Sequence, residues 1–70
     1  KSYLSGQFVP VEKYHCHHIK PLSKGGDNNF LNLCVLSEEE HRILHSKDPQ
    51  RLYQMYPNRT GRVKFLIGNL

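Results

Sequence analysis

The stretch that decides the fold runs from Tyr14 to His45 and reads YHCHHIKPLSKGGDNNFLNLCVLSEEEHRILH. Two runs within it, Tyr14 to Ile19 and Leu33 to Leu36, have the length and composition of short β-strands. The segment between them is dense in Pro, Gly, Ser, Asp and Asn, which favour turns. We therefore predict an antiparallel hairpin closed by a compact loop.

A helix is expected directly after the hairpin. Ser37 is a good N-cap residue, and Glu40 stands three residues later as its capping-box partner. The pattern predicts a helix from Ser37 to about Ser46. Its apolar stripe is thin, with Leu44 on the side of His41 and Ile43 opposite.

In the rest of the chain, the pattern predicts a second helix. This helix is capped by Asp48, has Pro49 at its first position and ends near Tyr56. The segment from Arg62 to Ile67 fits either a strand or a helix. We expect one α+β domain over residues 1–70, with a motif core at 14–46 and a basic extension at 49–70.

The histidines suggest a metal site, because all five lie between His15 and His45. His41 and His45 are four residues apart, so they share one helix face, and His17 lies near the end of the first strand. These three imidazoles are expected to hold one divalent ion with coordination positions left open. The ion would replace part of the core, so metal affinity and stability should fall together below about pH 6. The same spacing also arises by chance in a chain with this many histidines.

The net charge of +4 comes from the carboxy-terminal part of the chain. Residues 1–48 contain six basic and six acidic residues, whereas residues 49–70 contain four basic residues and no acid. This tail is either a phosphate-binding surface or an ordinary solvated basic face.

Cysteine content and hydropathy bear on the compartment. Cys16 and Cys34 are too few for a disulfide scaffold, so we expect free thiols, buried on the strands, in a reducing cytoplasm. No apolar run approaches the roughly 20 residues of a membrane span. The chain begins with Lys1, and we expect a soluble piece of a longer protein with no membrane partner.

The string HHIKPLSKGG at His17 to Gly26, followed by Asn32-Leu33, Leu36, His41 and His45, resembles the HNH endonucleases. The resemblance covers Tyr14 to His45 and implies the ββα-metal, or His-Me finger, fold, here with an additional C-terminal helix. It implies that His17, His41 and His45 bind the metal and that His18 is the general base. Asn32 would brace the loop and hold the base in orientation.

The resemblance implies a DNA endonuclease that hydrolyses a phosphodiester with a His18-activated water, leaving 5′-phosphate and 3′-hydroxyl ends. The divalent ion would be Mg²⁺, Mn²⁺, Zn²⁺, Ni²⁺ or cobalt. The candidate phosphate contacts are Lys20, Lys24, Arg42, Arg51, Arg59, Arg62 and Lys64.

This sequence departs from the family where many members carry two pairs of zinc-binding cysteines. Those positions are Ser2, Ser5, Ser37 and Glu40, so we expect no structural zinc held by cysteines, which leaves open how the amino-terminal segment is held. His15 lies two residues from His17, so it either contacts phosphate or metal-bound water or is simply an exposed strand residue, and we expect the second.

Within the family, the motifs look most like the C-terminal endonuclease domain of group II intron-encoded reverse transcriptase/maturase proteins, which would nick target DNA. DNA is the expected partner, and a parent protein would add RNA; the sequence indicates no oligomeric state. Two alternatives stay open: a non-catalytic, zinc-stabilised DNA-binding module, and a toxin or restriction-type HNH nuclease.

Overall fold

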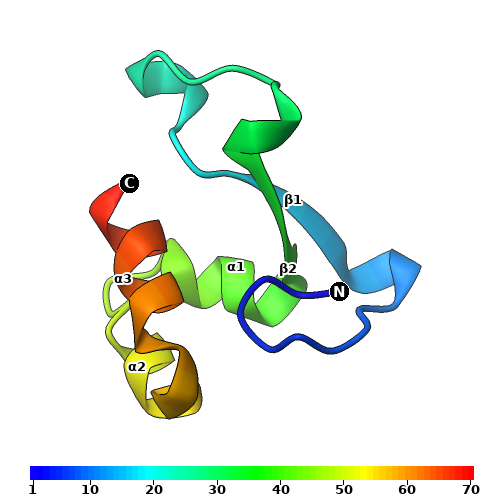
Figure 1. The fold of residues 1–70 in the computed structure, drawn as a ribbon, viewed down its shortest axis with the longest axis vertical. Helices are drawn as coiled ribbons and strands as arrows, with labels where there is room; N and C mark the ends of the chain where they lie inside the picture. Colours follow the sequence, from blue (N-terminus) through cyan, green and yellow to red (C-terminus); the bar gives the residue numbers. More distant parts are fainter.

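The computed structural model describes residues 1–70, and its ribbon is shown in Figure 1. Strand β1 (Tyr14–His18) pairs antiparallel with strand β2 (Leu33–Ser37). Tyr14 lies opposite Ser37, and His18 lies opposite Leu33. The predicted hairpin is therefore confirmed, with β1 one residue shorter than expected and β2 one residue longer.

Helix α1 (Glu38–Leu44) follows β2 without a linker, because Ser37 is both the last strand residue and the N-cap. The Glu40 amide donates to Ser37 Oγ at 3.2 Å, and the Ser37 amide donates to Glu40 Oε1 at 2.9 Å. This is the predicted capping box. The helix ends at Leu44, earlier than predicted, since the hydroxyl of Ser46 donates back to the Ile43 carbonyl at 2.6 Å. His45 is consequently the C-cap residue.

Two further helices follow, α2 (Arg51–Met55) and α3 (Thr60–Gly68). Helix α2 begins later than the predicted Asp48 cap, because the amides of Arg51 and Leu52 first close three-residue turns onto Asp48 and Pro49. The segment from Arg62 to Ile67 is helical. Short 3₁₀ turns occupy Val11–Lys13, Leu22–Lys24, Phe30–Asn32 and Pro57–Arg59.

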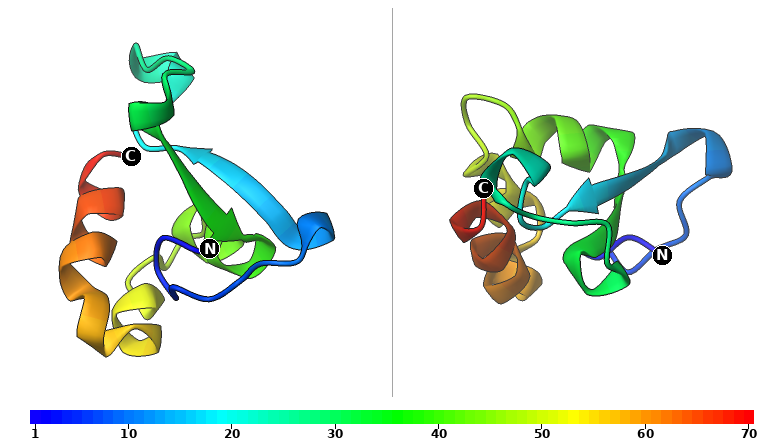
Figure 2. Two further views of the ribbon diagram at one scale, coloured as in Figure 1. Left: turned by 45° about the vertical axis from the view of Figure 1, so that its right-hand side comes forward. Right: turned by 90° about the horizontal axis from the view of Figure 1, so that it is seen from above.

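The elements form a small α+β domain, and Figures 1 and 2 show how they are arranged. Helix α1 packs against both strands and against α2, and α3 contacts α2. The loop between β1 and β2 projects at the end of the molecule opposite α2 (Figure 1). None of the helices combines the length and apolar character needed to cross a bilayer.

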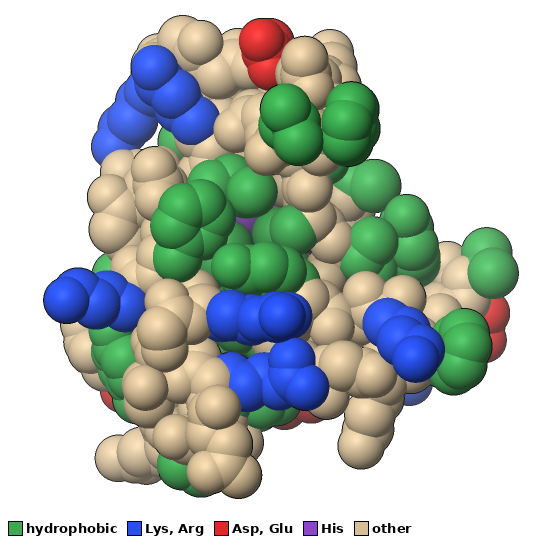
Figure 3. Space-filling view, viewed as in Figure 1, with side chains coloured by type: hydrophobic (Ala, Val, Ile, Leu, Met, Phe, Trp, Pro, Cys, Tyr) green, Lys and Arg blue, Asp and Glu red, His purple; other side chains and the backbone are tan.

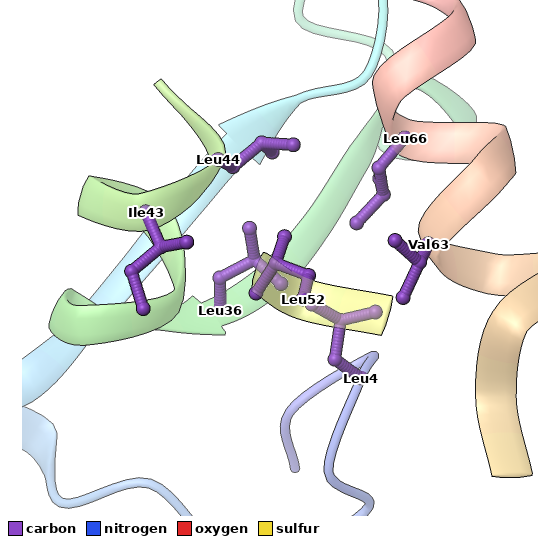
Figure 4. Packing of buried hydrophobic residues seen from close by; sticks show 7 residues of the cluster. All are labelled: Leu4, Leu36, Ile43, Leu44, Leu52, Val63 and Leu66. Carbon is purple, nitrogen blue, oxygen red and sulfur yellow. The ribbon is translucent and has the colours of Figure 1, made fainter. Parts of the chain in front are cut away.

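The core is small and is contributed by the amino-terminal segment, β2 and the three α-helices (Figure 4). Its seven buried apolar residues are Leu4, Leu36, Ile43, Leu44, Leu52, Val63 and Leu66. Ile43 and Leu44 are both buried because α1 is packed between the hairpin and α2. The prediction of a thin stripe that excludes Ile43 was therefore wrong.

The amino-terminal segment is held by a buried carboxylate. Glu40 is 2% exposed, and its Oε1 accepts a hydrogen bond from Ser2 Oγ at 2.6 Å. Its Oε2 accepts from the hydroxyl of Tyr56. The Tyr3 amide also donates to the Val35 carbonyl at 2.8 Å. Hydrogen bonds thus join the amino-terminal segment to α1 and β2, and join α1 to the end of α2.

The same segment lies against the basic tail at Gly6. Gly6 has φ +71°, and a Cβ there would lie 2.8 Å from the guanidinium of Arg59. A side chain at this position would strain the backbone, and the end of the Arg59 side chain would have to move away. The glycine permits the close approach of loop and tail.

Candidate metal centre

The structure brings together the three histidines predicted as metal ligands. His17 comes from β1, His41 from α1, and His45 from the C-cap of α1. Each offers a ligand atom, and these atoms all lie within 4.8 Å of one another. The ring centroids are 4.7 to 5.3 Å apart. Three imidazoles so placed could hold one metal ion.

His17 shows the fit of this site to an ion most clearly. Its side chain is 2% exposed, and its Nε2 is buried without a hydrogen-bond partner. An unpaired buried polar atom costs about 1–3 kcal/mol in a folded protein. Coordination to a metal would satisfy this nitrogen, and the neighbouring donors are of the type that transition metals prefer.

The electrostatics of the cluster favour neutral imidazoles. Burial, followed by the nearby His41, His45 and His18, lowers the pKa of His17 to about 4. Burial, His45 and His15 likewise lower the pKa of His41. Metals bind only the neutral form of imidazole, so both residues are ready to bind a metal at neutral pH.

A pocket of about 230 Å³ opens beside the three histidines. His45 is exposed, whereas His17 lies at the buried side of the group. Three protein ligands next to an open pocket leave space for water and a substrate group, as in catalytic metal sites. The pocket is lined by Cys16, His17, His18, Pro21, Leu22, His41 and His45.

His18 follows His17 and lies at the same pocket, outside the three-histidine group. Its Nε2 is 2.8 Å from Oδ1 of Asn28. Since an amide oxygen only accepts hydrogen bonds, His18 Nε2 donates in this contact, and in the neutral ring the lone pair is then on Nδ1. Asn28 was not singled out from the sequence, where it is one polar residue in a loop full of them.

Asn32 braces the loop, as the resemblance implied. Its Oδ1 accepts from the Lys20 amide at 2.8 Å, and its Nδ2 donates to the carbonyls of Lys20 and Asp27 at 3.0 and 2.8 Å. The side chain makes all of these bonds to the backbone. The residue that hydrogen-bonds to His18 directly is Asn28, so any influence of Asn32 on His18 would pass through the loop.

Three other strand residues differ in burial from what the sequence predicted. His15 is half-buried rather than exposed, and its Nδ1 lies 2.9 Å from His41 Nδ1, because α1 packs over β1. Cys16 is exposed rather than buried, and Cys34 is half-buried; both are free thiols. Burial, Cys16 and Glu40 raise the pKa of Cys34 to about 11, which keeps its thiol protonated.

The predicted phosphate-binding residues fall into two groups. Lys20, Lys24 and Arg42 are exposed on the loop and α1. The tail residues Arg51, Arg59, Arg62 and Lys64 lie on or between α2 and α3. Lys and Arg side chains gather across the middle of the face in Figure 3.

Two of the arginines have contacts within the protein. Arg59 is half-buried beside Gly6. The guanidinium of Arg62 donates to the Tyr3 carbonyl at 2.7 Å and lies 4.7 Å from the Tyr3 ring centroid. Arg62 therefore helps to hold the amino-terminal segment, and Arg59 lies beside that segment.

Comparison with known proteins finds no relative: no protein-family model, no curated protein and no solved structure matches the chain.

Proposed function

We propose that this chain is a metal-dependent DNA endonuclease of the HNH type with a ββα-metal fold. The observation that carries the proposal is the juxtaposition of three imidazoles with ligand atoms within 4.8 Å and a fourth, His18, held by Asn28 at the same pocket. The order β1, β2, α1, with ligands on β1 and α1, supports it. The resemblance of the motifs supplies the activity.

In the proposed mechanism His17, His41 and His45 hold the ion. A bound divalent ion supplies Lewis-acid stabilisation of negative charge on the phosphate. His18 Nδ1 accepts a proton from water as the water oxygen bonds to phosphorus. The bond from phosphorus to the 3′ oxygen breaks, and that oxygen takes a proton from solvent. The products are 5′-phosphate and 3′-hydroxyl ends.

DNA binding rests on backbone phosphates in this proposal. Lys20 and Lys24 are exposed on the loop that follows His18, and two other residues of this loop, Pro21 and Leu22, line the pocket. The ammonium group of Lys24 donates to the Leu70 carbonyl at 2.6 Å, a contact that a phosphate would have to replace. Phosphate contacts position a nuclease without reading sequence. Target choice would then come from other parts of a group II intron-encoded parent, which would also contact RNA.

A non-catalytic, metal-stabilised DNA-binding module is the second candidate. The small core and the unpaired nitrogen of His17 favour it, since both indicate a domain that gains stability from an ion. The two functions share the three ligands and differ in His18, which a purely structural site does not need.

A plasmid-nicking assay with metals supplied one at a time tests the proposal on the full chain and on His18→Ala. Loss of a general base lowers the rate by about 10²–10⁴-fold. Metal uptake and DNA affinity should stay close to wild type, because His18 is outside the ligand group. Equal nicking by both proteins would refute the general-base role. A wild-type chain that binds metal and DNA without nicking would favour the second candidate.

Variants of Asn28 test the role of His18 with a smaller expected loss of rate. Asn28→Ala removes the acceptor from His18 Nε2 and should cost part of the base's contribution, on the order of 10-fold to 100-fold in rate. Asn28→Asp keeps an oxygen acceptor and is the matched control. If both variants nicked at the wild-type rate, the hydrogen bond would have no role in orienting His18.

A further inference from the structure

His15 is an imidazole that the proposed mechanism does not use. It lies on β1 two residues before His17, so the two side chains leave the strand on the same face. Its ring contacts that of His41 edge-on, with centroids 5.1 Å apart and planes at 75°. The two Nδ1 atoms are 2.9 Å apart, which is hydrogen-bond distance.

The direction of this hydrogen bond decides what His41 can bind. A neutral imidazole has one N–H and one lone pair. If His15 donated, the Nδ1 lone pair of His41 would be used and its Nε2 would carry the proton. If His41 donates from Nδ1, its Nε2 lone pair is free. Only the second arrangement leaves His41 able to bind a metal ion while the hydrogen bond persists.

We propose that His15 is a positioning residue that accepts the Nδ1–H of His41 and holds its Nε2 available to the ion. This inference rests on the metal site of the proposed function. Metal-binding histidines commonly donate their other ring N–H to an acceptor that fixes the tautomer and the ring orientation. Here the acceptor is a second imidazole, delivered by the strand that also carries His17.

His15 acts through His41 and is not itself a ligand. The group whose donor atoms lie within 4.8 Å of one another contains His17, His41 and His45, without His15. The ring of His41 packs against those of His17 and His45 as well as that of His15. His41 therefore links His15 to the ligand group.

Titration with Co²⁺, and with Zn²⁺ in competition, tests the proposal on the full chain. Removing an acceptor that supports a metal ligand typically lowers affinity by about 10-fold to 100-fold, which we expect for His15→Leu. His15→Asn places an amide oxygen near the position of Nδ1 and should restore most of the affinity. Tyr14→Leu is the matched control, because Tyr14 is on the same strand and its hydroxyl contacts Cys16 rather than the ligand group.

The outcomes separate the possibilities. Wild-type affinity in His15→Leu would overturn the proposal. Failure of His15→Asn to rescue, together with a changed cobalt absorption spectrum, would make His15 a ligand and also overturn it. If His15→Leu does not fold, nitrogen-15 NMR of the metal-loaded wild type decides: His41 protonated on Nδ1 supports the proposal, and protonation on Nε2 refutes it. A wild type that binds no ion would overturn the proposed function as well.

Discussion

The buried imidazole of His17 gives the metal-free chain a pH-dependent stability. Its pKa lies near 4 in the folded chain, against 6.5 as the ordinary value, chiefly because of burial. Between these values the unfolded chain binds a proton that the folded chain does not, so acid favours unfolding. The free energy of unfolding is therefore unaffected by this group above pH 6.5 and decreases as the pH falls towards 4.

Melting curves recorded with chelator across this interval should therefore show a falling melting temperature in acid. His17→Leu is the control, since it fills the buried position without a titrating group. The expected result is a flatter pH profile in the variant than in the wild type. Parallel profiles would mean that another group dominates the acid response.

At the scale of elements, the Glu40 hydrogen bonds join separate segments of the chain. Tyr56→Phe removes one hydroxyl from a buried carboxylate and should lower the free energy of unfolding by about 1–3 kcal/mol. Tyr53→Phe is the matched control, because Tyr53 packs against the same core from α2 and does not bond to Glu40. Denaturant titration of both variants measures the difference. Equal stability of the two variants would show that the Tyr56 bond contributes nothing net.

At this scale, the features that the sequence could predict are those formed by residues close together in the chain. The hairpin, the capping box and the face shared by His41 and His45 depend on residues close together in the chain, and each was confirmed. The contact of His15 with His41 spans 26 positions and exists only once α1 docks on β1. Glu40 was predicted as a cap, but its bonds to Ser2 and Tyr56 depend on long-range packing that no periodicity reveals.

The molecule as a whole buries few apolar side chains, so hydrophobic burial stabilises its fold only weakly. Its core contains seven buried apolar residues, and domains of this size usually need an added stabilising element. An ion present at 100 times its dissociation constant stabilises the fold by about 2.7 kcal/mol. In a domain of this size each kcal/mol moves the melting temperature by about 4–8 °C.

Chelation should accordingly lower the melting temperature by on the order of 10 °C or more at neutral pH. Calorimetry before and after chelator treatment, with and without added Zn²⁺, measures the shift. His45→Ala removes the exposed ligand with little effect on the core and should reduce the shift. A melting temperature that changes with neither chelator nor zinc would contradict a coupling between metal binding and folding.

The absence of a linker at Ser37 has a consequence for which insertions the domain can accept. One added residue at the start of α1 would rotate the rest of the helix by about 100°, turning His41 and His45 away from His17. Between Ile19 and Asn32, by contrast, the chain is a surface loop that can lengthen without rotating either ligand-bearing element. Length variation in that loop is therefore compatible with an intact histidine cluster. Because the loop lies beside His18, added residues there would alter what reaches the pocket and leave the three histidines in place.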